Sequence, residues 1–175
     1  QKHKSQVHRK ITRGFACVRP VFLGACALVL VRFSMADHRQ ELYQQTILEH
    51  TRNPRNFRKI ETPTHWAEGY NPLCGDHLNI YLVVDGQGII QDVTFDGSGC
   101  AISKASASMM TASIKGKSAA EAKNLFEQFH KLVIGELKPD REPNSLEKLA
   151  VFSGIWQYPA RVKCALLSWM ALADA

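Results

Sequence analysis

The chain has 175 residues, 45% of them hydrophobic, a composition that suits one folded domain with a tail and excludes wholesale disorder. Its formal net charge of +6 is unevenly distributed, because residues 1–34 contain seven Lys or Arg and no Asp or Glu. Residues 35–175, the body of the chain, therefore carry a net charge of only −1. A body so close to neutral gives no reason to expect a nucleic-acid partner.

Residues 1–34 differ in character from the rest of the chain. They hold a basic stretch and then twelve apolar residues, Pro20 to Val31, between two arginines. A helix that crosses a membrane needs about 20 such residues, and the pattern superficially resembles a secretory signal. Ordinary soluble sequence begins at Met35, the first methionine. We interpret residues 1–34 as an upstream translated or leader segment, disordered or loosely helical. Residues 35–175 are then a single domain, with no membrane partner for this body of the chain.

The first elements of the body follow from periodicity and turn residues. Apolar residues at helical spacing predict a helix over 38–51, which Asn53-Pro54 ends. Residues 53–70 are predicted to be a loop, with a short strand near 65–70. Alternation then predicts a strand over 78–84, a turn over 85–88 and a return strand over 89–95. The glycine-rich residues 96–99 are expected to end that strand.

The second half of the body is predicted to be mainly helical. We expect helices over 101–115 and 119–133, an exposed loop over 135–145 and a short helix over 146–152. Pro159 suits the first position of a last helix over 159–173. Its buried stripe is predicted to be Val162, Ala165, Leu166, Trp169 and Met170. Met109 and Met110 are expected to lie in the core.

The cysteines of the body are the candidates for chemistry. Cys17 and Cys26 belong to the leader, which leaves Cys74, Cys100 and Cys164 as an odd number of widely spaced thiols. This count favours metal binding or thiol chemistry in a reducing compartment over a disulfide framework. Each of the three lies at a junction between predicted elements, and junctions at one end of a small sheet can converge.

Asp76 lies two residues after Cys74, so three thiolates and one carboxylate could supply the four ligands of zinc or of an iron–sulfur cluster. The alternative that the residues leave open is that each cysteine is simply a small buried hydrophobic residue. Arg161 and Lys163 lie three residues and one residue before Cys164 and could balance the negative charge of such a site. Because four ligands are already present, His65 and His77 are expected not to be ligands.

Three separated motifs carry a resemblance to a known family. The segments NPLCGDHLNIYLVVD, FDGSGCAISKASASMM and YPARVKCALLSWMAL, in this order, closely resemble the iron–sulfur assembly proteins related to NifU and IscU. The likeness covers about residues 42–172 and includes the first helix. Lys163 stands where IscU-type proteins usually have histidine, and residues 116–150 look like the insertion of SufU-type proteins. Both details point to the SufU branch.

The resemblance implies an α+β fold, with a small antiparallel three-stranded sheet and helices packed on one side. It implies a zinc ion held by Cys74, Asp76, Cys100 and Cys164. In the SufU branch the protein is a zinc-dependent sulfurtransferase, a persulfide carrier rather than a conventional small-molecule enzyme. Its partners are a SufS-type, pyridoxal-phosphate-dependent cysteine desulfurase and downstream cluster-assembly proteins, and its location is cytoplasmic.

The resemblance also assigns roles within the site. Cys74 matches the sulfur acceptor and would leave the metal to take the sulfur, while Arg161 could steady the negative site. Two alternatives remain. One is a scaffold that assembles a [2Fe–2S] cluster, or holds iron, on the same residues. The other is a small domain with a purely structural zinc, which predicts that Cys74 is buried and unreactive.

Overall fold

The computed structural model describes residue 41 and residues 43–175, so the expectations for residues 1–34 lie outside the described part. Residues 43–52 are helical, in agreement with the predicted first helix. The strands and helices that follow are β1 (His65–Asn71), β2 (Asp76–Val84), β3 (Ile90–Ser98), α2 (Ala101–Ile114), α3 (Ala119–Ile134), the 3-10 helices η1 (Glu147–Phe152) and η2 (Ile155–Gln157), and α4 (Pro159–Asp174). No helix in this part of the chain is long and apolar enough to cross a membrane.

The three strands form one antiparallel sheet in the order β1-β2-β3. Alternate residues of the central strand, Leu78, Ile80 and Leu82, are buried, as the period of two predicts. Opposite them on β3 lie the buried Phe95 and Val93. One face of the sheet therefore forms one side of the hydrophobic core. The α+β fold expected from the resemblance is confirmed.

The β2–β3 pairing extends beyond the predicted ends of both strands. β2 starts at Asp76 rather than residue 78, and β3 continues to Ser98 rather than ending at residue 95. Gly97 makes this possible, because its φ is +117° and a Cβ built there would lie 2.2 Å from the carbonyl oxygen of His77. The glycine that was expected to end the strand instead lets the two backbones approach closely.

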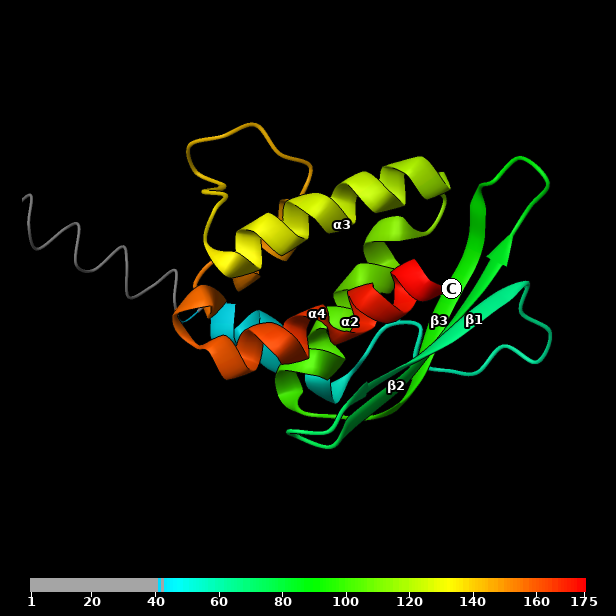
Figure 1. Ribbon diagram of the computed structural model, residues 1–175, viewed down its shortest axis with the longest axis horizontal. Helices are drawn as coiled ribbons and strands as arrows, with labels where there is room; N and C mark the ends of the chain where they lie inside the picture. The colour runs from blue at the N-terminus through cyan, green and yellow to red at the C-terminus, as the bar shows by residue number, and fades with distance from the viewer. Residues whose placement is uncertain (1–40, 42) are drawn as a thin grey trace, which may run out of the picture. The chain divides into compact units, whose positions relative to one another are not determined.

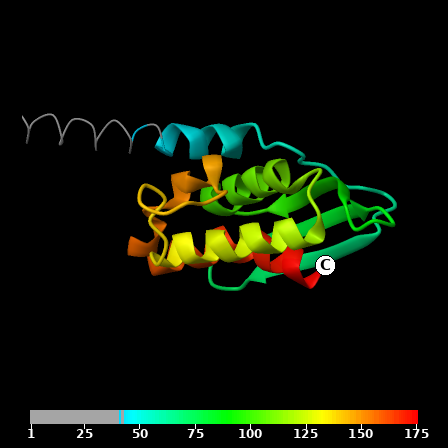
Figure 2. The same ribbon diagram turned by 90° about the horizontal axis from the view of Figure 1, so that it is seen from above.

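Two helices cover the inner face of the sheet. α4 packs against β1 and β2, and α2 packs against β3 and α4 (Figures 1 and 2). α3 packs against α4 from the other side (Figure 1). The hydrophobic core includes an aromatic contact between α3 and α4, where the ring of Trp169 is stacked 4.7 Å from that of Phe129. Met109 and Met110 are buried in this core, as predicted.

The predicted buried stripe of α4 is wrong at one residue. Met170 has 57% of its surface exposed, whereas Ser168 and Ala171 beside it are buried. α4 is covered by the sheet on one side and by α2 and α3 on the other, so only a narrow strip of it reaches solvent. Met170 shares that strip with the exposed Lys163 and Asp174, seven residues before it and four after it.

α2 carries a row of buried hydroxyl groups that connect it to its neighbours. The Ser106 hydroxyl donates to the carbonyl of Ala165 on α4 at 2.6 Å. On the opposite side, the Ser108 hydroxyl accepts the backbone N–H of Arg55 at 2.7 Å and lies 2.8 Å from Nδ1 of His50. His50 is 4% exposed, and this burial, with the positive charge of Arg55, lowers its pKa. Figure 2 shows the helical residues 43–52 alongside α2.

Candidate metal centre

The turn between β1 and β2 presents Cys74 at one end of the sheet. The carbonyl of Asn71 accepts the backbone N–H groups of Cys74 and Gly75, at 3.3 and 2.9 Å. Gly75 has a φ of +70°, a conformation that favours glycine and closes the turn. The Cys74 thiol is exposed, and Leu73 before it is 77% exposed. A partner can therefore reach this sulfur from solvent.

Asp76, the first residue of β2, points to the inner face of the sheet. It shares the alternation of Leu78 and is only 2% exposed. Its Oδ1 accepts the backbone N–H of Cys100 at 2.8 Å, whereas its Oδ2 makes no hydrogen bond of ordinary geometry with a described residue. Burial alone would raise the pKa of this carboxyl. Interactions with the Cys74 thiol, the Cys100 N–H and the Cys164 thiol outweigh it and lower the pKa, so Asp76 is a carboxylate.

Cys164 comes from the second turn of α4 and is buried. Its Sγ lies 3.6 Å from Sγ of Cys74, and both thiols are free. Burial, the Cys74 thiol and the nearby Cys100 raise the pKa of Cys164 well above its usual range. The thiol of Cys164 therefore stays protonated unless a cation compensates the charge of the thiolate.

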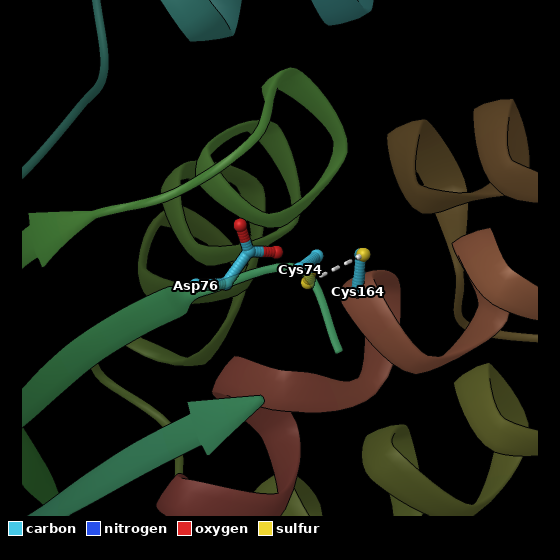
Figure 3. A group of neighbouring side chains, drawn as sticks. All are labelled: Cys74, Asp76 and Cys164. Atoms are coloured by element: carbon cyan, nitrogen blue, oxygen red, sulfur yellow. Dashed lines mark hydrogen bonds between the residues drawn. The ribbon is translucent and has the colours of Figure 1, made fainter. Parts of the chain in front are cut away.

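Cys100 is the N-cap residue of α2. Its Sγ accepts the backbone N–H of Ser103 at 3.5 Å, so the helix end faces this sulfur. The ligand atoms of Cys74, Asp76 and Cys164 all lie within 4.8 Å of one another (Figure 3), but Cys100 is not in that group. It is linked to the group by the hydrogen bond from its N–H to Asp76 and by the interaction of its side chain with Cys164.

Three observations indicate that these residues fit a zinc ion. Sulfur atoms on one tetrahedral zinc lie about 3.8 Å apart, given Zn–S bonds of about 2.3 Å, and the sulfurs of Cys74 and Cys164 lie 3.6 Å apart. The buried Oδ2 of Asp76 lacks an ordinary hydrogen-bond partner. The donor set of thiolate and carboxylate is one that zinc accepts. With the thiol of Cys100 turned toward the group, the chain would supply four ligands.

The two basic residues that were predicted to support the charge of the site, Arg161 and Lys163, do not contact its carboxylate. The guanidinium of Arg161 lies 4.6 Å from the ring centroid of the exposed Tyr158, as a cation–π pair. Lys163 is exposed. Within the described residues neither forms an ion pair with Asp76. A role of Arg161 in charge support remains a prediction.

The two neighbouring histidines have partners outside the thiol group. Nε2 of His77 lies 2.8 Å from Oε1 of Glu68, and its ring meets Tyr70 edge-on. These residues lie on the outer face of the sheet, because His77 alternates with the inward-facing Asp76. Nδ1 of His65 lies 3.0 Å from the hydroxyl of Thr64. Neither histidine belongs to the group of ligand atoms formed by Cys74, Asp76 and Cys164, and that they are not ligands stays a prediction.

Ser103 matters to this geometry but was not expected from the sequence, whereas Gly99 was expected, as a glycine before Cys100, to allow a close backbone approach. The buried Ser103 contacts Cys100 through both its N–H and its hydroxyl. Gly99 packs so closely against Ser103 and Asp76 that a Cβ would lie 2.4 Å from the Ser103 hydroxyl. The position of Ser103, three residues after an N-cap, is a pattern that could have identified it.

Comparison with known proteins gives consistent relatives. Residues 42–165 match the family described as NifU-like N terminal domain. The chain is 40% identical over 131 residues to a protein of Bacillus subtilis (strain 168) named zinc-dependent sulfurtransferase SufU, an alignment that covers 75% of this chain and 86% of the relative. It is 38% identical over 135 residues to a Thermotoga maritima protein named iron–sulfur cluster assembly scaffold protein IscU, covering 77% and 92%.

Solved structures of similar proteins share the fold. FiSufU of Fervidobacterium islandicum AW-1, described as a proposed iron–sulfur cluster assembly scaffold for the SUF system, superposes with a TM-score of 0.69 at 35% identity, covering 74% of this chain and 93% of that one. The N-terminal part of a nitrogen-fixing NifU-like protein of Brucella abortus gives a TM-score of 0.64 at 25% identity, covering 75% and 90%.

Proposed function

The chain belongs to the family of NifU-like N-terminal domains, and on this premise we propose that it is a zinc-dependent sulfurtransferase of iron–sulfur cluster biogenesis. It would accept persulfide sulfur from a SufS-type, pyridoxal-phosphate-dependent cysteine desulfurase and supply downstream cluster-assembly proteins. The observation that carries the proposal is the exposed thiol of Cys74, 3.6 Å from the buried thiol of Cys164 and beside a buried carboxylate. Three free thiols suit a reducing compartment such as the cytoplasm.

Cys74, Asp76, Cys100 and Cys164 would hold the zinc ion. A bound zinc keeps thiolates deprotonated near neutral pH without redox chemistry. This matters most for Cys164, whose pKa is raised by burial. Asp76 is already ionised, and the Cys100 N–H holds one of its oxygens in place. The chain thus offers one fixed carboxylate and sulfur ligands that differ in exposure.

The exposure of Cys74 supports it as the acceptor of sulfur. In the transfer its thiolate attacks the terminal sulfur of the donor persulfide, forming a new S–S bond while the donor S–S bond breaks. The donor cysteine leaves as a thiolate and Cys74 carries the persulfide, so charge and electrons balance without an oxidant. The buried Cys164 could not meet a donor in this way.

A cluster scaffold is the second candidate, because the Thermotoga maritima relative named as an IscU scaffold is almost as similar as the SufU relative. The same four side chains would then hold a [2Fe–2S] cluster. Lys163, where the IscU type has histidine, supports the sulfurtransferase. The purely structural zinc predicts a buried Cys74, and the exposed Cys74 speaks against it.

The test combines metal analysis with a desulfurase assay on the full chain. We expect one zinc per chain after purification without added iron, and faster turnover of a SufS-type desulfurase in its presence. Mass spectrometry after incubation should show one added sulfur on Cys74. The Cys74→Ala variant should lose both the stimulation and the added sulfur, whereas the control Cys17→Ala should keep them.

Two results would redirect the proposal. Stimulation that survives Cys74→Ala would contradict the sulfurtransferase. A coloured cluster that forms on the wild-type chain and transfers to an apo-protein would favour the scaffold instead.

A further inference from the structure

We propose that Ser103 is a positioning residue of the metal centre, which orders Asp76 and Cys100 without being a ligand; this inference rests on the proposed zinc site. Ser103 is fully buried in the first turn of α2. Its backbone N–H donates to Sγ of Cys100 at 3.5 Å, and its hydroxyl donates to the carbonyl of Cys100 at 3.0 Å. One residue thereby holds both the thiol and the peptide of Cys100.

The hydroxyl of Ser103 also packs against the backbone that leads to the site. A Cβ built on Gly99 would lie 2.4 Å from Oγ of Ser103 and 3.4 Å from Cγ and Oδ1 of Asp76. No methyl group fits between these atoms unless one of them moves. The serine hydroxyl, the glycine and the carboxylate therefore form one close-packed unit.

A chain of contacts runs from Ser103 to the carboxylate. Ser103 fixes the carbonyl of Cys100, and the N–H of Cys100 donates to Oδ1 of Asp76 at 2.8 Å. This leaves Oδ2 of Asp76 without an ordinary hydrogen bond and free for a cation. Partners of this kind, which orient the ligands of a metal, typically change metal affinity about 10- to 100-fold when they are removed.

Substitutions on the full chain test this role. Ser103→Ala removes the hydroxyl and keeps the backbone N–H, and we expect zinc affinity, measured by chelator competition, to fall about 10- to 100-fold. Ser113→Ala is the matched control, because the Ser113 hydroxyl donates to a carbonyl of the same helix, that of Met109. It should bind zinc like the wild type. In the cobalt-substituted protein, the thiolate-to-cobalt absorption should change for Ser103→Ala and not for Ser113→Ala.

Gly99→Ala provides an independent variant. Its methyl group would strike the Ser103 hydroxyl, so we expect a loss of zinc affinity of about tenfold or more. In the double variant Gly99→Ala/Ser103→Ala the obstructing hydroxyl is absent, and part of the Gly99→Ala loss should be recovered. If the two residues acted independently, the losses of zinc affinity from Gly99→Ala and Ser103→Ala would instead add in the double variant.

The outcomes separate this inference from the proposed function. A wild-type chain that binds neither zinc nor cobalt overturns both. A wild-type chain that binds zinc, with a Ser103→Ala variant that binds equally well and has the same cobalt spectrum, overturns only the role of Ser103. If Ser103→Ala does not fold, Gly99→Ala decides, and wild-type affinity in that variant overturns the proposal.

Discussion

The thiols of Cys74 and Cys164 lie 3.6 Å apart, although 90 residues separate them in the chain and only Cys74 is exposed. The two sulfurs are therefore close neighbours with different environments. One lies on a turn at the surface, and the other is buried in the second turn of α4. The same substitution should have different consequences at the two positions.

Without metal, Cys74→Ala should change the free energy of unfolding by less than about 0.5 kcal/mol, because the side chain is exposed. Cys164→Ala should lower it by about 1 kcal/mol, because a buried sulfur leaves a small cavity. Urea unfolding in the presence of a chelator measures both. Equal destabilisation by the two variants would contradict the environments described above.

Two buried serines should respond to alanine in opposite ways. Ser106→Ala removes the acceptor of the Trp169 indole N–H and the donor to the carbonyl of Ala165, and should cost about 2 kcal/mol or more. The Ser168 hydroxyl is buried and has no hydrogen-bond partner within the described residues. Ser168→Ala should therefore be neutral or stabilising. Thermal unfolding of both variants is the measurement, and a larger loss for Ser168→Ala would refute the prediction.

Stability should depend on pH through His50. The folded chain lowers the pKa of His50 below its ordinary 6.5, so the unfolded chain binds this proton more tightly. The contribution of neutral His50 is complete above pH 6.5 and is lost as the pH falls below that value, toward the folded pKa. His50→Gln should therefore show a shallower loss of unfolding free energy than the wild type between neutral and mildly acidic pH.

His130 supplies the control for this experiment. It is exposed on α3, so His130→Gln makes the same side-chain change without removing the buried contact of His50, and it should keep the slope of the wild type. The comparison is made by urea titrations at several pH values. A wild-type slope in His50→Gln would show that the contact between His50 and Ser108 does not control the titration.

Two glycines should differ sharply in their tolerance of a methyl group. Gly97→Ala places a Cβ 2.2 Å from the carbonyl oxygen of His77, and residue 97 has a φ of +117°. This substitution should destabilise the fold by about 1–3 kcal/mol or more. Gly86 lies in open space, so Gly86→Ala should be neutral or stabilising by up to about 1 kcal/mol. Denaturant midpoints measure the difference, which a tolerated Gly97→Ala would contradict.

Sequence periodicity predicted the elements of this fold well, since alternation and helical spacing act locally. It placed the end of β3 too early, before Gly97, because the pairing of that residue with β2 is not a local property of the sequence. It failed at Met170 because α4 is covered from two sides, and a single apolar stripe describes a helix covered from one. No local pattern predicted the contacts of the buried Ser106 and Ser108 hydroxyls, since their partners lie elsewhere in the chain.

The candidate site was predictable to a similar extent. The position of three cysteines at element junctions indicated that they could converge, and the structure brings Cys74 and Cys164 together with Asp76. It does not place the thiol of Cys100 in the same close group, because that sulfur caps α2. The close packing of Gly99 against Ser103 and Asp76 brings together residues far apart in the sequence, which spacing along the chain cannot reveal.

The separation of Cys74 and Cys164 by 90 residues has a consequence during protein synthesis. At about 5–20 residues per second, the ribosome adds Cys164 roughly 5–20 s after Cys74. During that interval the nascent β1–β2 hairpin carries its thiol without the α4 half of the site. The proposed metal site can therefore be completed only after Cys164 has been added and α4 has left the exit tunnel.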